Sequence, residues 1–385
     1  MINTTTSTIV GSEVGYIEDV IKLRSLSGKG KYTKLCEEWL ERLMPKGRAL
    51  VVSSCTSALE MAAILANIQP GDEIIVPSYT YVTTVNSFVL RGAIPVFVDI
   101  GDATMNINAA YIEAAITAKT RAIVAVHYGG LACDMDRIMK IAKKHHLFIC
   151  EDAAMACTST YKGQMLGTIG NVGCISFQEK KNFTAGGQGG ALLINDPDLI
   201  NRAEHIYDHG TNRASFIRGE AECYQWLDLG LNATLSEIQA AFLYAQLQNA
   251  DGINSRRRHI WHRYHACLAV LAQRGHIMLP HIPDNTTHNA NVFWIRLVDA
   301  TQRVSLISHL DRAGVQAHPQ FMPLHTSPYG RIHGRFSGID RVTSLAAAQI
   351  LLLPLHTALS DAQQDLVISE LFSFWAEKQV NDPTI

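Results

Sequence analysis

The feature that most constrains the fold is an alternation of short apolar runs with longer helix-forming stretches between about residues 48 and 245. The runs are continuously apolar and rich in β-branched residues, which is typical of strands covered on both faces. The predicted strands are Arg48–Ser53, Glu73–Val76, Ile94–Val98, Arg121–Val126 and His146–Cys150, and the predicted helices are Thr56–Asn67, Thr80–Leu90 and one around Asp134–Lys144. This order predicts βαβ units and an α/β fold with a mostly parallel sheet flanked by helices.

The regular alternation of strands and helices ends near residue 245, which predicts a second domain after it. A helical stretch without proline runs from 234 to 272, and it begins at Thr234–Glu237 (TLSE), a capping-box sequence. Strand-like and helix-like segments then mix, at Ile277–Pro280, Asn291–Leu297, Ser305–Ala313 and Asp361–Trp375. We predict a large domain over residues 1–245 and a smaller α+β domain over residues 246–385, joined by the long helix. The first 30 or so residues are expected to pack with either one.

Composition excludes several classes of protein. Hydrophobic residues make up 47% of the chain and charged residues 18%, so a sizeable core is expected rather than disorder. A net charge of −2 argues against a nucleic-acid surface, and no apolar run approaches the roughly 18 residues of a membrane span. The N-terminus lacks a signal-peptide pattern, and eight single cysteines without a CxxC pair favour reduced thiols and a cytoplasmic protein. The sixteen histidines form no HExxH motif, so no metal site is predicted.

Three polar features follow predicted strands, where open α/β sheets bind ligands. Glu151-Asp152 comes directly after one strand, and Ser53–Ala58 opens the first long helix. Between Ser176 and Asn182 two adjacent lysines precede a glycine-rich stretch. Each feature alone is more simply explained as a turn, a helix cap or a solvated loop.

Taken together, the three features indicate a pyridoxal phosphate site. The helix N-terminus suits the phosphate, a lysine forms a Schiff base with the aldehyde, and a buried carboxylate keeps the ring nitrogen protonated. Asp152 supplies the acid, and a lysine lies 29 residues later. Tyr81 is predicted to stack on one face of the ring, and Ala154 to pack on the other.

Several blocks of this sequence resemble the DegT-type nucleotide-sugar aminotransferases, in order and spacing, over roughly residues 10–375. They include CTSALEMAA, QPGDEIIVPSYTYVTTVNSFVLRGA, VFVDI, EDAA, TYKGQMLGTIG, KNFTAGG, GGALLIND, HGTNR and MPLH. The resemblance implies a pyridoxal-phosphate-dependent transferase of fold type I. It also implies a homodimer with active sites at the subunit interface.

The resemblance assigns roles to individual residues. The Schiff-base lysine is Lys181, rather than Lys180, because it precedes Asn182, and Asp152 is its catalytic partner. The implied cofactor-binding residues are Thr56, Ser57, Tyr81, Asp152, Ala154, Ser176, Lys181 and Asn232, the last reaching from the partner subunit. The diphosphate of such a substrate needs cationic partners, and Arg213 in the GTNR block is the first candidate, followed by Arg218 and Lys31, although any one of these could simply be a solvated surface residue. His325 in the MPLH block is a further predicted substrate contact.

The resemblance also implies the reaction. Glutamate gives its amino group to the cofactor, which then aminates a keto group of a nucleotide-linked 6-deoxy sugar. Lys181 serves a second time as the base that moves a proton between carbons. That role needs a partly neutral amine, and burial beside a cationic cofactor is expected to lower its pKa.

This sequence departs from the family pattern near the predicted site. Met155 stands where the family usually has a glutamine. Gln178 replaces a His or Tyr, Gln188 replaces an acid, and Gln320 and Phe321 replace a His and a Tyr. A different keto-sugar, a slower enzyme, or a non-catalytic binding or regulatory protein would each explain these changes. Retention of Lys181 and Asp152 favours aminotransfer, and Lys181 argues against a sugar dehydratase of the same fold.

Overall fold

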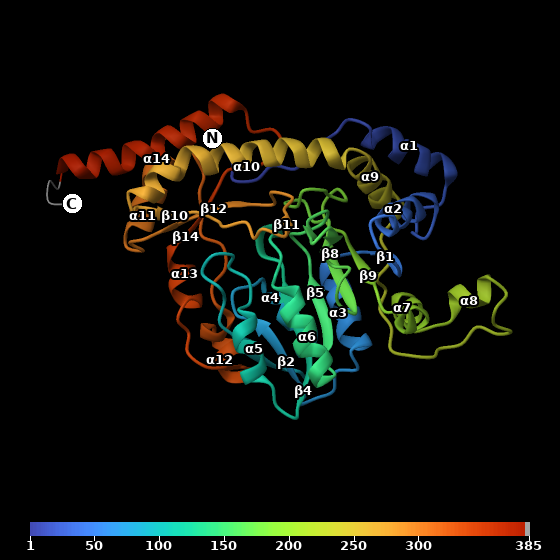
Figure 1. Ribbon diagram of the computed structural model, residues 1–385. Helices are drawn as coiled ribbons and strands as arrows, with labels where there is room; N and C mark the ends of the chain where they lie inside the picture. Colours follow the sequence, from blue (N-terminus) through green and yellow to red (C-terminus); the bar gives the residue numbers. More distant parts are fainter. Residues whose placement is uncertain (382–385) are drawn as a thin grey trace.

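An eight-stranded sheet lies at the centre of the computed structural model, which describes residues 1–381 (Figure 1). The strand order is β1-β9-β8-β5-β4-β2-β3-β13. Neighbours from β8 to β13 run parallel, whereas β9 is antiparallel to both β1 and β8. The predicted α/β class with a mostly parallel sheet is confirmed. The strands are β1 Arg48–Val52, β2 Glu73–Pro77, β3 Ile94–Val98, β4 Thr120–Val126, β5 Phe148–Asp152, β8 Val172–Ser176, β9 Gly190–Ile194 and β13 Arg335–Phe336.

Helices cover both faces of this sheet, which explains why its strands are continuously apolar. Alternate residues of one strand enter different cores: Ile74 and Val76 of β2 face one helical layer, and Ile75 faces the other. The first layer holds α3 Cys55–Leu65, α4 Val82–Val89 and α7 Ile200–Tyr207. The opposite layer holds α1 Glu13–Leu23, α2 Lys31–Glu41, α5 Ala109–Ala115, α6 Met135–His145 and α9 Glu237–Gln248.

The predicted helix over 234–272 is wrong in two details. It is divided into α9 and α10 Ala250–Gln273, because the side-chain amide of Asn249 donates to the Ala245 carbonyl and ends the first helix. The cap of α9 is Ser236, whose hydroxyl accepts from the Gln239 amide at 3.3 Å. Thr234 cannot cap the helix because its backbone is bridged to Val52 of β1.

A second core lies between α10 and the C-terminal helices. Its sheet is antiparallel and contains β10 Ile277–Met278, β12 Phe293–Leu297 and β14 Ile350–Leu353. The helices α11 Gln302–Arg312 and α14 Asp361–Asn381 pack with it. The remaining elements are β6 Thr160–Tyr161, β7 Gln164–Met165, β11 Thr286–Thr287, α8 Arg213–Ile217, α12 Pro328–His333, α13 Thr343–Gln349 and the short 3-10 turns Tyr128–Gly130, Pro197–Leu199 and Leu324–Thr326.

The two parts of the chain interleave more than the sequence indicates. β13 comes from the C-terminal part yet adds the last strand to the central sheet, where Arg335 pairs with Glu73 at 3.2 Å. β11 likewise pairs with β6. At the N-terminus, Ile2 bridges to Val315, whereas α1 and α2 pack against α9. The division at residue 245 stays a prediction.

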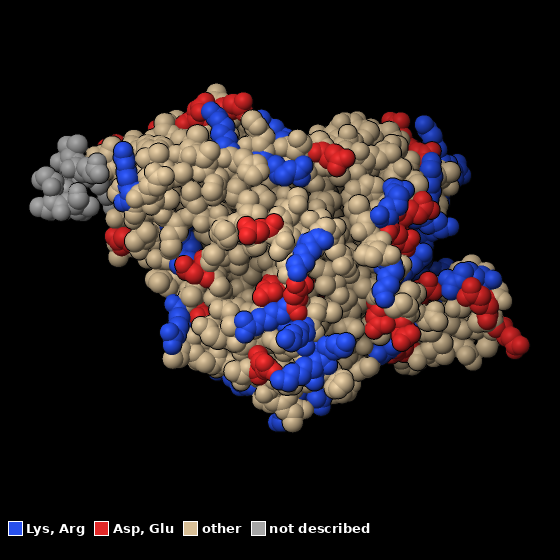
Figure 2. Space-filling model, viewed as in Figure 1, with Lys and Arg blue, Asp and Glu red and all other residues tan. Residues whose placement is uncertain are grey.

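The charge on the molecule is mixed. On the face shown in Figure 2, basic and acidic side chains are interspersed. No helix within residues 1–381 is both long and apolar enough to cross a membrane.

Candidate active site

The predicted acid Asp152 is the last residue of β5, at the carboxyl edge of the central sheet. Its side chain is 5% exposed, and both of its oxygens accept hydrogen bonds. The hydroxyl of Thr84 donates to Oδ2 at 2.6 Å, and the backbone amide of Ala154 donates to Oδ1 at 3.1 Å. Within residues 1–381 no cation forms an ion pair with Asp152. This carboxylate is therefore available to a cationic ligand.

The neighbouring acid, Glu151, points to the other face of β5 and has a structural role. It is fully buried and accepts from the amides of Gly167, Ile169 and Gly170 at 2.6–2.9 Å. His127 lies 2.9 Å from the same carboxylate, and its Nδ1 accepts from the Cys133 amide. Glu151 and His127 thus hold a loop in place, because successive strand residues face opposite sides.

The two adjacent lysines also differ in surroundings. Lys180 is exposed, whereas Lys181 is half-buried in the loop after β8. The ammonium of Lys181 has no hydrogen bond or ion pair to any residue between 1 and 381, although Asp152 and Cys55 lie close enough to act on it. Burial lowers the pKa of Lys181, against the opposing effect of Cys55 and Asp152. An unpartnered amine with a lowered pKa suits attack on an aldehyde.

Hydroxyl groups surround the N-terminus of α3. Ser54 caps the helix by accepting from the Ser57 amide at 3.0 Å, and the Ser57 hydroxyl lies 3.0 Å from those of Ser53 and Ser54. Gly190 of β9 lies so close that a Cβ there would meet the Cys55 nitrogen at 2.5 Å. Free amides, hydroxyls and the helix dipole together favour a phosphate.

The remaining predicted phosphate and ring contacts lie on the same edge of the sheet. Ser176 ends β8, and its hydroxyl accepts from the Gln178 amide at 3.3 Å. Thr56 is half-buried in the first turn of α3. Tyr81 precedes α4 with 59% of its surface exposed, and Ala154 is half-buried just after Asp152. All four residues therefore lie at the ends of strands or the starts of helices along the carboxyl edge of the central sheet, where a cofactor is predicted.

The predicted substrate cations are separated. Arg213 begins α8 with 54% of its side chain exposed, 3.8 Å from Asp208. Arg218 is paired with Glu204 and Glu220, and Lys31 is paired with Asp19 at 2.8 Å. Arg213 is therefore the least committed of the three, because its contact with a carboxylate is the longest.

Asn232 and His325 have partners within their own chain. Asn232 is bridged to Asp208, and its side-chain oxygen accepts from the Thr234 hydroxyl at 3.3 Å. His325 lies between Ser78 at 2.7 Å and Asp340 at 3.1 Å. Burial lowers the pKa of His325, against the opposing effect of Asp340. These contacts fix the His325 ring at the end of β2.

Three of the departures from the family pattern form one wall. Met155 is 7% exposed and belongs to an apolar cluster with Tyr79 and Tyr128. Gln320 accepts from the Tyr128 hydroxyl, and the ring of Phe321 lies 5.5 Å from that of Tyr79. The Phe321 ring also lies 6.2 Å from the ring of Tyr81. Phe321 thus links this apolar cluster to the ring of Tyr81.

The other two departures lie outside this wall. Gln178 accepts from the Lys180 amide at 2.9 Å. Gln188 is exposed, and its carbonyl accepts from Gln239. Neither side chain contacts Tyr81 in the part of the chain that the structure describes.

Sequence reasoning missed two threonines. Thr84 donates to Asp152, and Thr80 lies 2.9 Å from Thr84; both are buried. In the helix expected from the sequence, Thr80–Leu90, a spacing of four residues would place both on one face, which was the available signal. In the structure α4 begins only at Val82, so Thr80 precedes the helix and Thr84 lies in its first turn.

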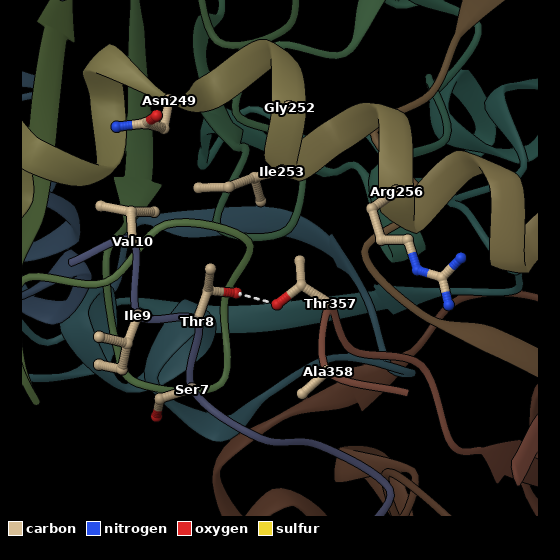
Figure 3. Close-up of a pocket in the computed structure, with 10 residues that line it drawn as sticks. All are labelled: Ser7, Thr8, Ile9, Val10, Asn249, Gly252, Ile253, Arg256, Thr357 and Ala358. Atoms are coloured by element: carbon tan, nitrogen blue, oxygen red, sulfur yellow. Dashed lines mark hydrogen bonds between the residues drawn. The ribbon is translucent and has the colours of Figure 1, made fainter. Parts of the chain in front are cut away.

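A further cavity lies elsewhere in the fold. It measures about 610 Å³ and is lined by the N-terminal segment, the start of α10 and residues 357–358 (Figure 3). Thr8 and Thr357 are joined across it by a hydrogen bond of 2.9 Å. Arg256 on its rim is already paired with Asp361 at 3.0 Å. None of the predicted site residues lines this cavity. Among residues 1–381 no cluster of three or more His, Cys, Asp or Glu side chains is arranged to hold a metal ion.

Comparison with known proteins decides the family. The model of the DegT/DnrJ/EryC1/StrS aminotransferase family matches residues 8–372. This chain belongs to that family. It is a pyridoxal-phosphate-dependent aminotransferase.

Individual family members are similar over nearly their whole length. A GDP-perosamine synthase of Caulobacter vibrioides is 33% identical over 94% of this chain and 95% of its own. The structure of the aminotransferase TlmJ from Streptoalloteichus hindustanus matches 98% of this chain and 100% of its own, with a TM-score of 0.89 and 30% identity. The protein Spr1654 of Streptococcus pneumoniae, solved in a PLP form, is 27% identical with a TM-score of 0.85, over 97% of this chain and 98% of its own. Aminotransfer is thus the chemistry that this chain shares with its family.

Proposed function

We propose that the enzyme moves an amino group from glutamate to the keto group of a nucleotide-linked 4-keto-6-deoxyhexose. The observation that carries this proposal is the position of the unpartnered Lys181 amine near the buried Asp152 and beside α3. Within this class, dTDP-4-dehydro-6-deoxyglucose is the substrate that the sequence resemblance favours. The enzyme would then be a dTDP-4-amino-4,6-dideoxygalactose transaminase or a close equivalent.

The nucleotide is the least constrained part of the substrate. The relative named GDP-perosamine synthase supports a GDP-linked sugar, whereas the sequence blocks favour a dTDP-linked one. Arg213 is the proposed diphosphate contact because its guanidinium lies 3.8 Å from Asp208 and is otherwise exposed. Lys31 and Arg218 are second choices, since each is already paired with a carboxylate.

When bound, pyridoxal phosphate supplies an aldehyde that accepts the amino group and a ring that stabilises negative charge on the neighbouring carbon. We propose that Lys181 holds it covalently and later carries the proton between carbons. Asp152 keeps the ring nitrogen protonated. Ser57, Thr56 and Ser176 bind the phosphate.

A homodimer and a cytoplasmic location are part of the same proposal. Asn232 is proposed to act in the partner's site. The eight free cysteines, five of them buried, support a reducing compartment.

The experiment is to incubate the purified enzyme and glutamate with dTDP- and GDP-linked 4-keto and 3-keto sugars. Mass spectrometry reads the exchange of a carbonyl oxygen for an amine. We expect one 4-keto sugar to be aminated. Amination of 3-keto sugars alone would overturn the proposed position.

A second candidate is a non-catalytic binding or regulatory protein. The apolar wall around Met155 favours it, because methionine cannot donate a hydrogen bond to the cofactor. Failure to bleach the visible band of the cofactor with glutamate, together with retained sugar binding, would support this reading.

A further inference from the structure

Asp152 is an unusual place to bury a charge. It is 5% exposed, and no cation pairs with it within residues 1–381. Lys181 acts on it only at longer range, and a buried carboxylate without a paired cation is costly unless hydrogen bonds hold its charged form. The Ala154 amide supplies one such bond. Because this donor belongs to the backbone, the bond does not depend on which side chain is at position 154. The second bond comes from a side chain, Thr84.

The hydrogen bonds around Thr84 have one direction. An ionised carboxylate accepts only, so the Thr84 hydroxyl must give its proton to Asp152 at 2.6 Å. Its oxygen is then free to accept from the Thr80 hydroxyl at 2.9 Å. Hydrogen bonds therefore connect Thr80 to Thr84 and Thr84 to Asp152.

Burial strengthens these two hydrogen bonds. Thr80 and Thr84 are 2% and 1% exposed, so water does not replace either hydroxyl. Both threonines belong to the entry of α4, which packs on α3, the helix proposed to hold the phosphate. A hydrogen bond to a charged group in such surroundings is stronger than a neutral one.

We propose that Thr84 is a positioning residue, which fixes the charge and orientation of Asp152 toward the cofactor ring, with Thr80 acting behind it. This inference rests on the proposed role of Asp152. Thr84 does not touch the substrate. Its loss should weaken cofactor binding and lower kcat while leaving the KM for glutamate nearly unchanged.

The test compares Thr84→Val, which keeps the shape, with Thr84→Ser, which keeps the hydroxyl. Cofactor affinity is measured by titrating the apoprotein with pyridoxal phosphate, and melting temperatures confirm folding. We expect Thr84→Val to weaken affinity by roughly 10- to 100-fold and Thr84→Ser to restore most of it. Thr80→Val should cause a smaller loss. Thr83→Val, on the same helix, serves as the matched control and should behave as wild type.

The double variant Thr84→Val with Asp152→Asn distinguishes the possible failures. If Thr84 acts through Asp152, the double variant loses little more than Asp152→Asn alone. Additive losses, or a Thr84→Val loss that serine does not restore, would overturn the inference. If Asp152→Asn changes neither cofactor affinity nor kcat, the proposed role of Asp152 is wrong, and the proposed function is contradicted. If Asp152→Asn weakens cofactor affinity and Thr84→Val does not, the proposed role of Thr84 is wrong and the proposed function still stands.

Discussion

At two places in the chain, adjacent residues of the same charge have different surroundings, and only one of each pair has a proposed chemical role. Glu151 holds a loop, whereas Asp152 faces the site. Lys180 is exposed, whereas Lys181 is partly buried with a lowered pKa. We expect Lys181→Ala to abolish the visible absorption band of the bound cofactor and Lys180→Ala to keep it. Absorption spectra of the two purified variants check this expectation.

The Lys180→Ala protein is the matched control, since it removes the same charge from the adjacent position. Equal loss of the band in both variants, or loss in Lys180→Ala only, would contradict the assignment of Lys181. Melting temperatures close to wild type would show that neither spectrum reflects an unfolded protein.

At the scale of elements, one buried carboxylate joins two helices. Glu237 in the first turn of α9 accepts from the amides of Gly30, Tyr32 and Thr33 at 2.8–3.2 Å, at the start of α2. Gly30 is required there because a Cβ would meet the Glu237 carboxyl carbon at 2.7 Å. Glu237→Ala leaves these amides unpaired, so we expect the free energy of unfolding to fall by about 2–4 kcal/mol. Chemical denaturation measures this change.

Glu220→Ala is the control for the loss of a glutamate. Its carboxylate is exposed beside Arg218, so water replaces the contact and denaturation should be unchanged. Equal stability of Glu237→Ala and wild type would contradict the proposed joint between α9 and α2.

At the scale of the whole molecule, an arm formed by residues 208–231 extends from the body (Figure 1). It carries apolar side chains that face solvent, among them Ile217 at 70% and Trp226 at 78% exposure. Such surface favours contact with a second copy. We expect light scattering to give twice the chain mass of 42.4 kDa, and Trp226→Glu to shift the protein toward the single-chain mass.

Val304→Glu provides the comparison, because Val304 is 73% exposed on α11, far along the chain from the arm. It should leave the mass unchanged. A single-chain mass for the wild-type protein would contradict the dimer. If Trp226→Glu has the same mass as the wild-type protein, the arm is not part of the dimer interface.

Much of the fold follows from the sequence alone, because the apolar period within a strand or helix is a local property. It predicts β1 to β5, α3, α4 and α6 to within a few residues, and it places Asp152 at the end of a strand. The resemblance to the family, carried by blocks of sequence, predicts the cofactor and the reaction class.

Tertiary structure decided the contacts between residues far apart in the chain. β13 joins the central sheet beside β3, its Arg335 pairs with Glu73 across 262 residues, and Thr84 reaches Asp152 across 68 residues. No local pattern encodes such pairs, since a hydroxyl or a cation in the sequence shows neither its burial nor its partner. Those are set only when distant segments pack together.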